Sequence, residues 1–333
     1  MEVEKIHSEK INIQILVATL LLVAAFIISI GVGRYPISVK EIFDIILANE
    51  VKDMTRNVFF TLRLPRTIMV LLAGIGLSVS GSVYQTIFKN PLATPDIIGV
   101  SSGANLGAAT AIIFFTGSTI SIGAFAFLGG LGAVFAALSL TRISKNRSIS
   151  TFVLAGIVVG SLAHGFIMFL KYIADPERQL ATIEYWTMGS FASITAGKLI
   201  SILPYFIIGI SLLFLLRWQI NILSLSDEEA KSLGIKVGTI RVMVIIAATL
   251  VVASIVSVTG LISFIGLIGP HIARMLTKKN DFKTIILSGL IGGIILLISD
   301  ILARSIGSSE LPISILTTFI GAPFLAFLMR RLK

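Results

Sequence analysis

No cysteine occurs among the 333 residues of this chain. Disulfides, thiolate metal sites and cysteine nucleophiles are therefore excluded. Histidine is also scarce, and His7, His164 and His271 are too scattered to suggest a metal cluster. The sequence has no Gly-x-x-x-x-Gly-Lys-Ser/Thr phosphate loop, and no Gly-x-Gly-x-x-Gly motif follows a strand pattern. We therefore expect no catalytic residue, no metal site and no cofactor bound by this chain.

Charge is the next scarce property. Only 13% of the residues are charged and 55% are hydrophobic, whereas soluble domains contain about 25% charged residues. A surface this apolar must face lipid over much of its area. The net charge is +10, but no basic run is interleaved with aromatic residues, so nucleic acid is not an expected partner. Lys and Arg in cytoplasmic loops, next to anionic lipid, explain the basic excess.

Long apolar runs are what the sequence has instead. A hydrocarbon core of about 30 Å is crossed by a helix of roughly 20 residues. The runs predict an all-α polytopic membrane protein with about ten transmembrane helices, forming a single transmembrane domain over 1–333. The expected spans are 11–32, 66–86, 96–115, 121–140, 150–171, 198–217, 241–258, 260–277, 284–302 and 312–329. The seventh and eighth are joined so closely that nine spans with a re-entrant segment remains an alternative.

Short loops between spans indicate the orientation of the chain. Loop 141–149 holds three basic residues and loop 278–283 holds three against one acid, whereas loop 116–120 holds none. We therefore expect both termini in the cytoplasm. The run 11–32 has no convincing cleavage site, which favours a retained first span over a signal peptide.

Two polar stretches stand apart from the spans. Residues 36–48 alternate Ile with Lys, Glu and Asp, as in an amphipathic helix on the outer interface. Residues 221–236 form the largest inner loop between spans. In it, Ser226 is typical of an N-cap before a run of acids and Gly234 of a C-terminal stop. A short cytoplasmic helix in this segment is suited to contact by another protein.

Several motifs occur in a fixed order along the chain. The first group is RLPR (63–66), NPLATPD (90–96) and GVSSGA (99–104). The second is GLISFIGLIGPHIAR (260–274), ELP (310–312) and GAPF (321–324). In order and spacing, over about 60–330, these motifs resemble the FecCD family of ABC transporter permeases, whose members import ferric siderophores, haem and cobalamin.

The resemblance implies an architecture and a set of partners. The expected fold is the ten-helix bundle of type II ABC importers, similar to the vitamin B12 importer permease, with two five-helix units of opposite orientation. No such repeat is evident in the sequence. A second copy, as a homodimer, or a paralogue would complete a central pathway. Two cytoplasmic ATPase subunits would hold ATP and Mg, and an extracytoplasmic binding protein would deliver the substrate. The expected location is the cytoplasmic membrane of a prokaryote.

The resemblance also assigns roles to particular residues. Arg63, Arg66 and Arg304 are expected to dock acidic residues of the binding protein, because guanidinium groups bind carboxylates bidentately; anchoring to lipid headgroups is the alternative. Asp300 and Arg304 are one helical turn apart, and a pair between them would leave Arg304 less free to dock. The remaining expected residues are Leu225, Glu228, Ala230, Leu233 and Gly234 for contact with the ATPase; Arg147, Ser148 and Ser150 for an inner gate; and Asn90, Pro91, Gly99, Gly103, Pro270, Glu310 and Pro312 for a structural motif.

These expectations describe the permease subunit of an ATP-driven importer that moves a ferric siderophore-type chelate by alternating access. A cobalamin or haem importer of the same family is the alternative. An ion-gradient transporter is a weaker alternative, because most spans have no ionisable residue near their centres. A membrane-embedded enzyme would need an acid, base or metal inventory that the sequence does not offer, and a passive scaffold would not need the 221–236 segment.

Overall fold

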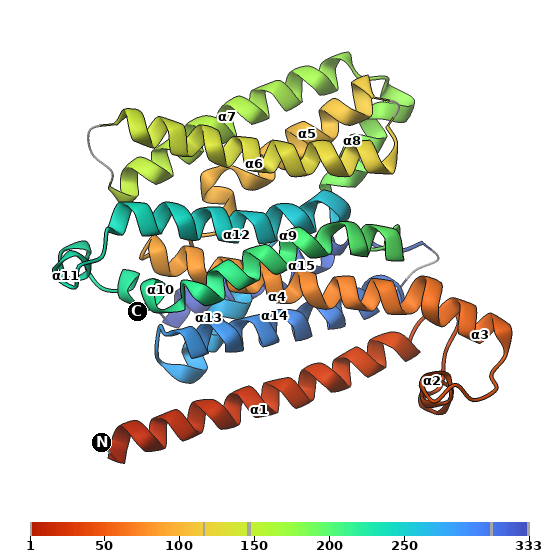
Figure 1. The fold of residues 1–333 in the computed structure, drawn as a ribbon. Helices are drawn as coiled ribbons and strands as arrows, with labels where there is room; N and C mark the ends of the chain where they lie inside the picture. Colours follow the sequence, from red (N-terminus) through yellow and green to blue (C-terminus); the bar gives the residue numbers. More distant parts are fainter. Residues whose placement is uncertain (1, 116, 145–147, 307–308, 332–333) are drawn as a thin grey trace. The chain divides into compact units, whose positions relative to one another are not determined.

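The computed structural model describes residues 2–115, 117–144, 148–306 and 309–331, and in this part of the chain all regular structure is helical (Figure 1). The α-helices are α1 (Glu2–Gly31), α2 (Val39–Ile46), α3 (Asp53–Val58), α4 (Leu64–Ile87), α5 (Val100–Phe114), α6 (Thr119–Ile143), α7 (Ile149–Ile173), α8 (Ala181–Thr187), α9 (Ala196–Leu215), α10 (Arg217–Leu223), α11 (Asp227–Ser232), α12 (Val237–Thr259), α13 (Ile265–Thr277), α14 (Phe282–Ala303) and α15 (Ile313–Arg331). Short π-helical turns occupy Phe59–Arg63 and Pro176–Leu180, and a 3₁₀ turn occupies Pro95–Ile98.

Each of the ten expected spans overlies a helix, which confirms an all-helical membrane protein. Among the described residues, seven helical segments are long and apolar enough to cross a bilayer. They are Glu9–Gly31, Asp53–Ile87, Thr119–Ile143, Ile149–Ile173, Ala196–Leu215, Val237–Thr259 and Phe282–Ala303. The helices α5, α13 and α15 are shorter, so the number of complete crossings stays a prediction.

Two of the short helices begin after an interruption. The helix α5 follows the 3₁₀ turn Pro95–Ile98, and Gly99 starts it with a φ of +87°. Prolines remove backbone donors and clash with a preceding helical turn, so Pro91 and Pro95 account for the break. The helix α13 follows the non-helical residues 260–264, and Phe264 before it has a φ of +68°. With 15 and 13 residues, these helices are about 20 Å long, too short to cross a bilayer alone.

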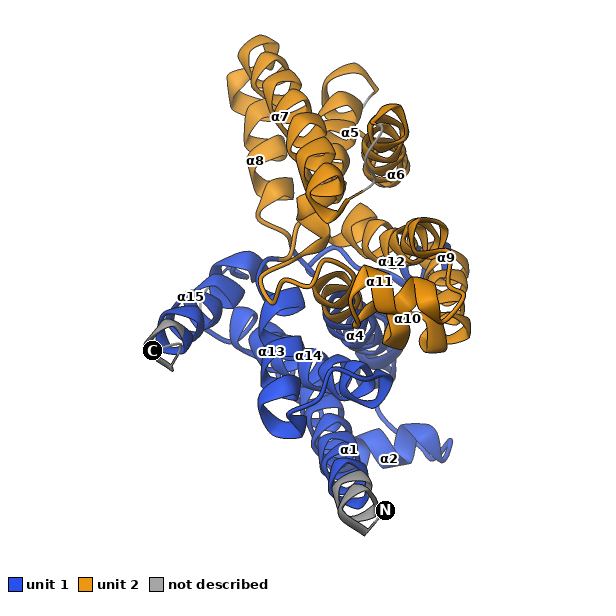
Figure 2. Cartoon of the chain, turned by 90° about the vertical axis from the view of Figure 1, so that its left-hand side faces the viewer, with its two compact units in different colours: residues 1–79, 190–201, 263–333 blue, residues 80–189, 202–262 orange. Residues whose placement is uncertain are grey.

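The chain divides into two compact units (Figure 2). Unit 1 contains residues 1–79, 190–201 and 263–333. In it α14 packs against α1, α13 and α15. Gly74 of α4 meets the backbone of Gly292 and Gly293 on α14, and the Ser78 hydroxyl donates to the Ser288 carbonyl at 2.6 Å. Close backbone approach of this kind is how membrane helices associate.

The expected amphipathic helix at 36–48 is present as α2 in unit 1. Its start carries a capping box, in which Ser38 and Glu41 each accept a hydrogen bond from the other's backbone N–H. Ile42 and Ile45 on its apolar face are buried in a cluster with Ile30 of α1. This packing fixes the loop that follows α1.

Unit 2 contains residues 80–189 and 202–262. Its core is the contact of α5 with α6, and α7 and α12 each pack against both of these helices. Gly103 of α5 lies against the backbone of Gly129 on α6, and Gly156 of α7 lies against the Ile97 carbonyl. These glycines thus mark tight helix contacts, because the absence of a side chain lets two backbones approach closely.

Candidate functional site

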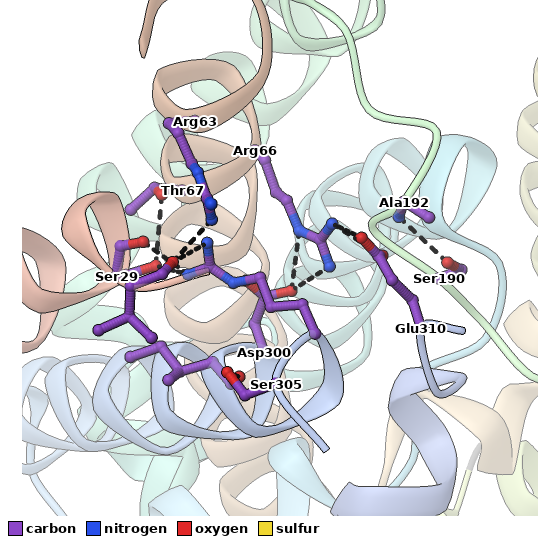
Figure 3. A network of polar contacts seen from close by, with 12 residues as sticks. Ser29, Arg63, Arg66, Thr67, Ser190, Ala192, Asp300, Ser305 and Glu310 are labelled. Atoms are coloured by element: carbon purple, nitrogen blue, oxygen red, sulfur yellow. Dashed lines mark hydrogen bonds and ion pairs between the residues drawn. The ribbon is translucent and has the colours of Figure 1, made fainter. Parts of the chain in front are cut away.

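A cluster of charged side chains lies in unit 1 where α4 begins and α14 ends (Figure 3). We call it the arginine cluster: Arg63, Arg66, Arg304, Asp300 and Glu310. The Arg66 Nε and Nη2 atoms donate to Asp300 Oδ1 at 3.1 and 2.9 Å. Its Nη1 atom donates to the two carboxylate oxygens of Glu310 at 2.9 and 2.8 Å. Arg66 therefore uses its whole guanidinium fork on two acids of its own chain.

The other two arginines hold the C-terminal end of α1. Arg304 lies 3.1 Å from Asp300 Oδ2 through Nε, and its Nη1 and Nη2 atoms donate to the carbonyls of Val32 and Ser29 at 2.9 and 2.6 Å. Arg63 donates to the same Val32 carbonyl at 2.7 Å. Carbonyls at a helix C-terminus lack intrahelical partners and attract cations. The arginines satisfy these carbonyls and tie α1 to α4 and α14.

Burial decides how this cluster behaves. Asp300 is 0% exposed, Arg304 5% and Arg63 8%. A carboxylate without contact to water needs opposite charges beside it, and Arg66 and Arg304 supply them from either side. Because three guanidinium groups face two carboxylates, the cluster retains an excess positive charge.

A second charged group lies in unit 2 at the start of α11. As expected, Ser226 caps this helix, and Glu229 completes a capping box by accepting from the Ser226 N–H at 2.8 Å. The Asp227 carboxylate is bound by Lys89 Nζ at 2.8 Å and by Arg241 Nη2 at 3.0 Å. Burial alone would raise the pKa of the Asp227 carboxyl, but the hydrogen bond from Lys89 and the charge of Arg241 hold it below its ordinary value.

The residues expected to contact an ATPase differ in their exposure. Leu225, Glu228, Leu233 and Gly234 are exposed on or beside α11, and Gly234 has the left-handed φ of +80° that suits a helix stop. Ala230 is fully buried and holds α11 against its own unit, so its side chain does not reach the surface. Their contact with a partner stays a prediction.

The expected gate and motif residues have visible local roles. Ser148 is the N-cap of α7 and accepts from the Thr151 N–H at 3.4 Å; Ser150 is exposed in the first turn, and Arg147 lies outside the described residues. Asn90 closes the turn after α4, where its Oδ1 atom accepts from the Leu92 N–H at 2.9 Å. Pro270 lies inside α13 and Pro312 directly precedes α15. In the described part of the chain, no group of three or more His, Asp or Glu side chains is placed to hold a metal ion.

Comparison with known proteins places this geometry in a family. The model of the FecCD transport family matches residues 21–331. The chain belongs to the FecCD transport family. The molybdate import system permease protein MolB of Haemophilus influenzae is 39% identical over 95% of this chain and 94% of its own length. The iron chelatin transport system permease protein of Helicobacter pylori is 38% identical over 86% of each chain. A solved inward-facing structure of a metal-chelate type ABC transporter has a TM-score of 0.85 and 38% identity, covering 95% of this chain and 98% of the other.

This FecCD chain is therefore a multi-pass ABC transporter permease with the type II importer fold. Sequence reasoning missed two features of its candidate sites. Glu310 was expected only as part of a structural motif, yet it binds Arg66 across 244 positions. Lys89 and Arg241 were assigned no contact from the sequence, yet both bind Asp227. No local sequence signal connects residues so far apart.

The docking role expected for Arg66 leads to a specific prediction for the FecCD permease. If Arg66 binds a carboxylate of the binding protein, Glu310 competes for the same donors. Glu310→Gln should then tighten binding of the extracytoplasmic binding protein about fivefold, the equivalent of about 1 kcal/mol. The dissociation constant would be measured on detergent-solubilised transporter, with Asp53→Asn, an exposed acid on α3, as the matched control. Unchanged affinity in Glu310→Gln would assign Arg66 to internal support alone.

Proposed function

We propose that this chain is the permease subunit of an ABC importer that moves a ferric siderophore-type chelate into the cytoplasm. The observation that carries the proposal is the similarity, along nearly the whole chain, to an iron chelatin permease and to a metal-chelate type transporter. The interrupted helices α5 and α13 support a transporter, because irregular backbone at membrane depth is tolerated where it is buried in protein or lines a water-filled cavity.

In this proposal the free energy comes from other chains. Two ATPase subunits bind ATP and Mg and press on the exposed face of α11, while a binding protein that carries the chelate docks through its acidic residues on the arginine cluster. A second copy of this chain completes the pathway by alternating access. The chain itself catalyses no bond chemistry, and it resides in the cytoplasmic membrane of a prokaryote with both termini in the cytoplasm.

A second candidate substrate is molybdate, because the molybdate permease is 39% identical over 95% of this chain. The two substrates differ in size and charge: molybdate is a small dianion, whereas a ferric chelate is a large complex. Cobalamin and haem, which the family also carries, are the remaining alternatives.

Reconstituted vesicles would separate these candidates. The chain would be placed in liposomes with its ATPase and binding protein, and uptake of radiolabelled ferric hydroxamate, ferric citrate, molybdate and cobalamin would be compared with and without ATP. We expect ATP-dependent iron uptake that needs the binding protein. Uptake of molybdate or cobalamin in place of iron would keep the importer and replace the substrate. Uptake that ignores ATP and follows a proton or sodium gradient would contradict the ABC mechanism.

A further inference from the structure

Arg241 is the largest fully buried side chain among the described residues, with an exposure of 1%. It lies in the second turn of α12, within unit 2. A buried guanidinium is costly unless an acid pairs with it. Its acid is Asp227, and Arg241 Nη2 donates to both carboxylate oxygens, at 3.0 and 3.2 Å. The charge inside the unit is thus balanced by the first residue of an exposed helix.

The same guanidinium also contacts α7. Its Cζ atom lies 6.0 Å from the ring centroid of Phe152, which is 2% exposed and lies in the first turn of α7. A cation at this distance from an aromatic face is attracted to it. Arg241 therefore pairs with α11 and lies over an aromatic ring in the first turn of α7, the helix that Ser148 caps.

Neighbouring contacts restrict how α11 can move. Figure 1 shows this short helix beside α10 and α12, and it packs against both. Lys89, on the turn after α4, donates to Asp227 Oδ1 at 2.8 Å and adds a second attachment. Displacing α11 away from Arg241 would leave a buried positive charge without its acid. Because breaking the Asp227–Arg241 pair is costly, a movement of α11 should displace α12 and α7 with it.

We propose that Arg241 is a positioning residue that links α11 mechanically to α12 and to the beginning of α7. The inference rests on the proposed function, in which the ATPases act on α11. A plain anchor for α11 would need only the salt bridge to Asp227. The additional contact with Phe152 gives the same side chain a connection to the helix that Ser148 caps and whose first turn contains Ser150.

The test is the ratio of substrate transported to ATP hydrolysed in liposomes holding the complete transporter. In Arg241→Gln we expect ATP hydrolysis to persist while transport per ATP falls about tenfold, a typical size for coupling between two sites. Arg241→Lys, which keeps the charge, should recover part of the ratio, and Phe152→Leu should lower it with the salt bridge intact. Lys279→Gln, which neutralises an exposed basic residue in the loop between α13 and α14, is the matched control and should leave the ratio unchanged.

A second variant keeps the test decisive if Arg241→Gln fails to fold. Asp227→Asn alters the partly exposed partner and leaves the buried Arg241 side chain in place; it should lower transport per ATP in the same way. Hydrolysis and transport that fall in parallel in the Arg241 and Asp227 variants, with an unchanged ratio, would overturn the link and leave an anchor only. Wild-type vesicles without ATP-driven uptake would instead overturn the proposed function and this inference with it.

Discussion

Asp300→Asn should be among the most destabilising single changes in this protein, lowering its stability by about 3–5 kcal/mol. The side chain is fully buried and lies 2.9 Å from Arg66 and 3.1 Å from Arg304. Asparagine keeps the shape but removes the negative charge. Two guanidinium groups would then face each other across a neutral amide, in a place that water does not reach. Thermal unfolding of the purified protein in detergent should show a large fall in the transition midpoint.

Glu310→Gln is the matched control for this prediction. Glu310 contacts the same arginine at 2.8 Å, but its side chain is 30% exposed. Water can solvate Arg66 on that side, so we expect a loss of about 1 kcal/mol or less. Asp300→Glu should recover part of the stability because it restores the charge. Equal midpoints for Asp300→Asn and Glu310→Gln would show that the buried carboxylate is not what holds the arginine cluster together.

The cluster also bears on how docking should be studied. The expected pair of Asp300 with Arg304 is confirmed at 3.1 Å, and it engages one of the three arginines assigned to docking. Arg66→Glu would place a third acid beside Asp300 and Glu310 and would destabilise the fold. A loss of uptake in that variant would therefore not distinguish misfolding from lost docking. Removing the competitor Glu310 leaves Arg66 in place and avoids this ambiguity.

The sequence predicts the helices well because hydrophobic length is a local property. Each expected span overlies a helix, but the expected span 260–277 starts before α13, which begins at Ile265. Residues 261–264 are mostly apolar and non-helical, and hydropathy does not distinguish an apolar irregular segment from an apolar helix. The interruption before α5 was easier to anticipate, because Pro91 and Pro95 act on the backbone directly. In each set of five expected spans, the interrupted helix is the third, a correspondence that the sequence alone did not show.

The sites divide in the same way between local and distant contacts. The Ser226 cap and the Asp300–Arg304 pair follow from spacings of three and four residues, and both are present. The pairs of Arg66 with Glu310 and of Arg241 with Asp227 depend on how helices pack, which no spacing rule gives. A basic residue at the end of a span is expected on general grounds, because Lys and Arg gather on the cytoplasmic side of a membrane. Nothing in the sequence therefore indicated that Arg241 is buried in an ion pair.

Replacing Gly129 by alanine should disrupt the contact of α5 with α6. A Cβ atom at this position would overlap the carbonyl oxygen of Gly103, and one on Gly103 would meet Gly129 and Ala133 in turn. Backbone atoms have little room to move in a packed interior, so we expect a loss of about 1–3 kcal/mol or more from either change. This result would give the expected motif residue Gly103 a measured structural role.

Gly132 offers a control on the same helix, three residues from Gly129. A Cβ atom there would have no neighbouring atom within 4 Å, and alanine is favoured over glycine inside a helix by about 0.5–1 kcal/mol. Gly132→Ala should therefore leave the unfolding midpoint in detergent unchanged or raise it, while Gly129→Ala lowers it. Both changes replace glycine by alanine in the same helix, so the gain in helix propensity is the same for each. The difference between the two midpoints then measures only the effect of the close approach of α5. Equal midpoints would mean that the two helices separate at little cost and that the contact of Gly103 with Gly129 does not determine how tightly unit 2 packs.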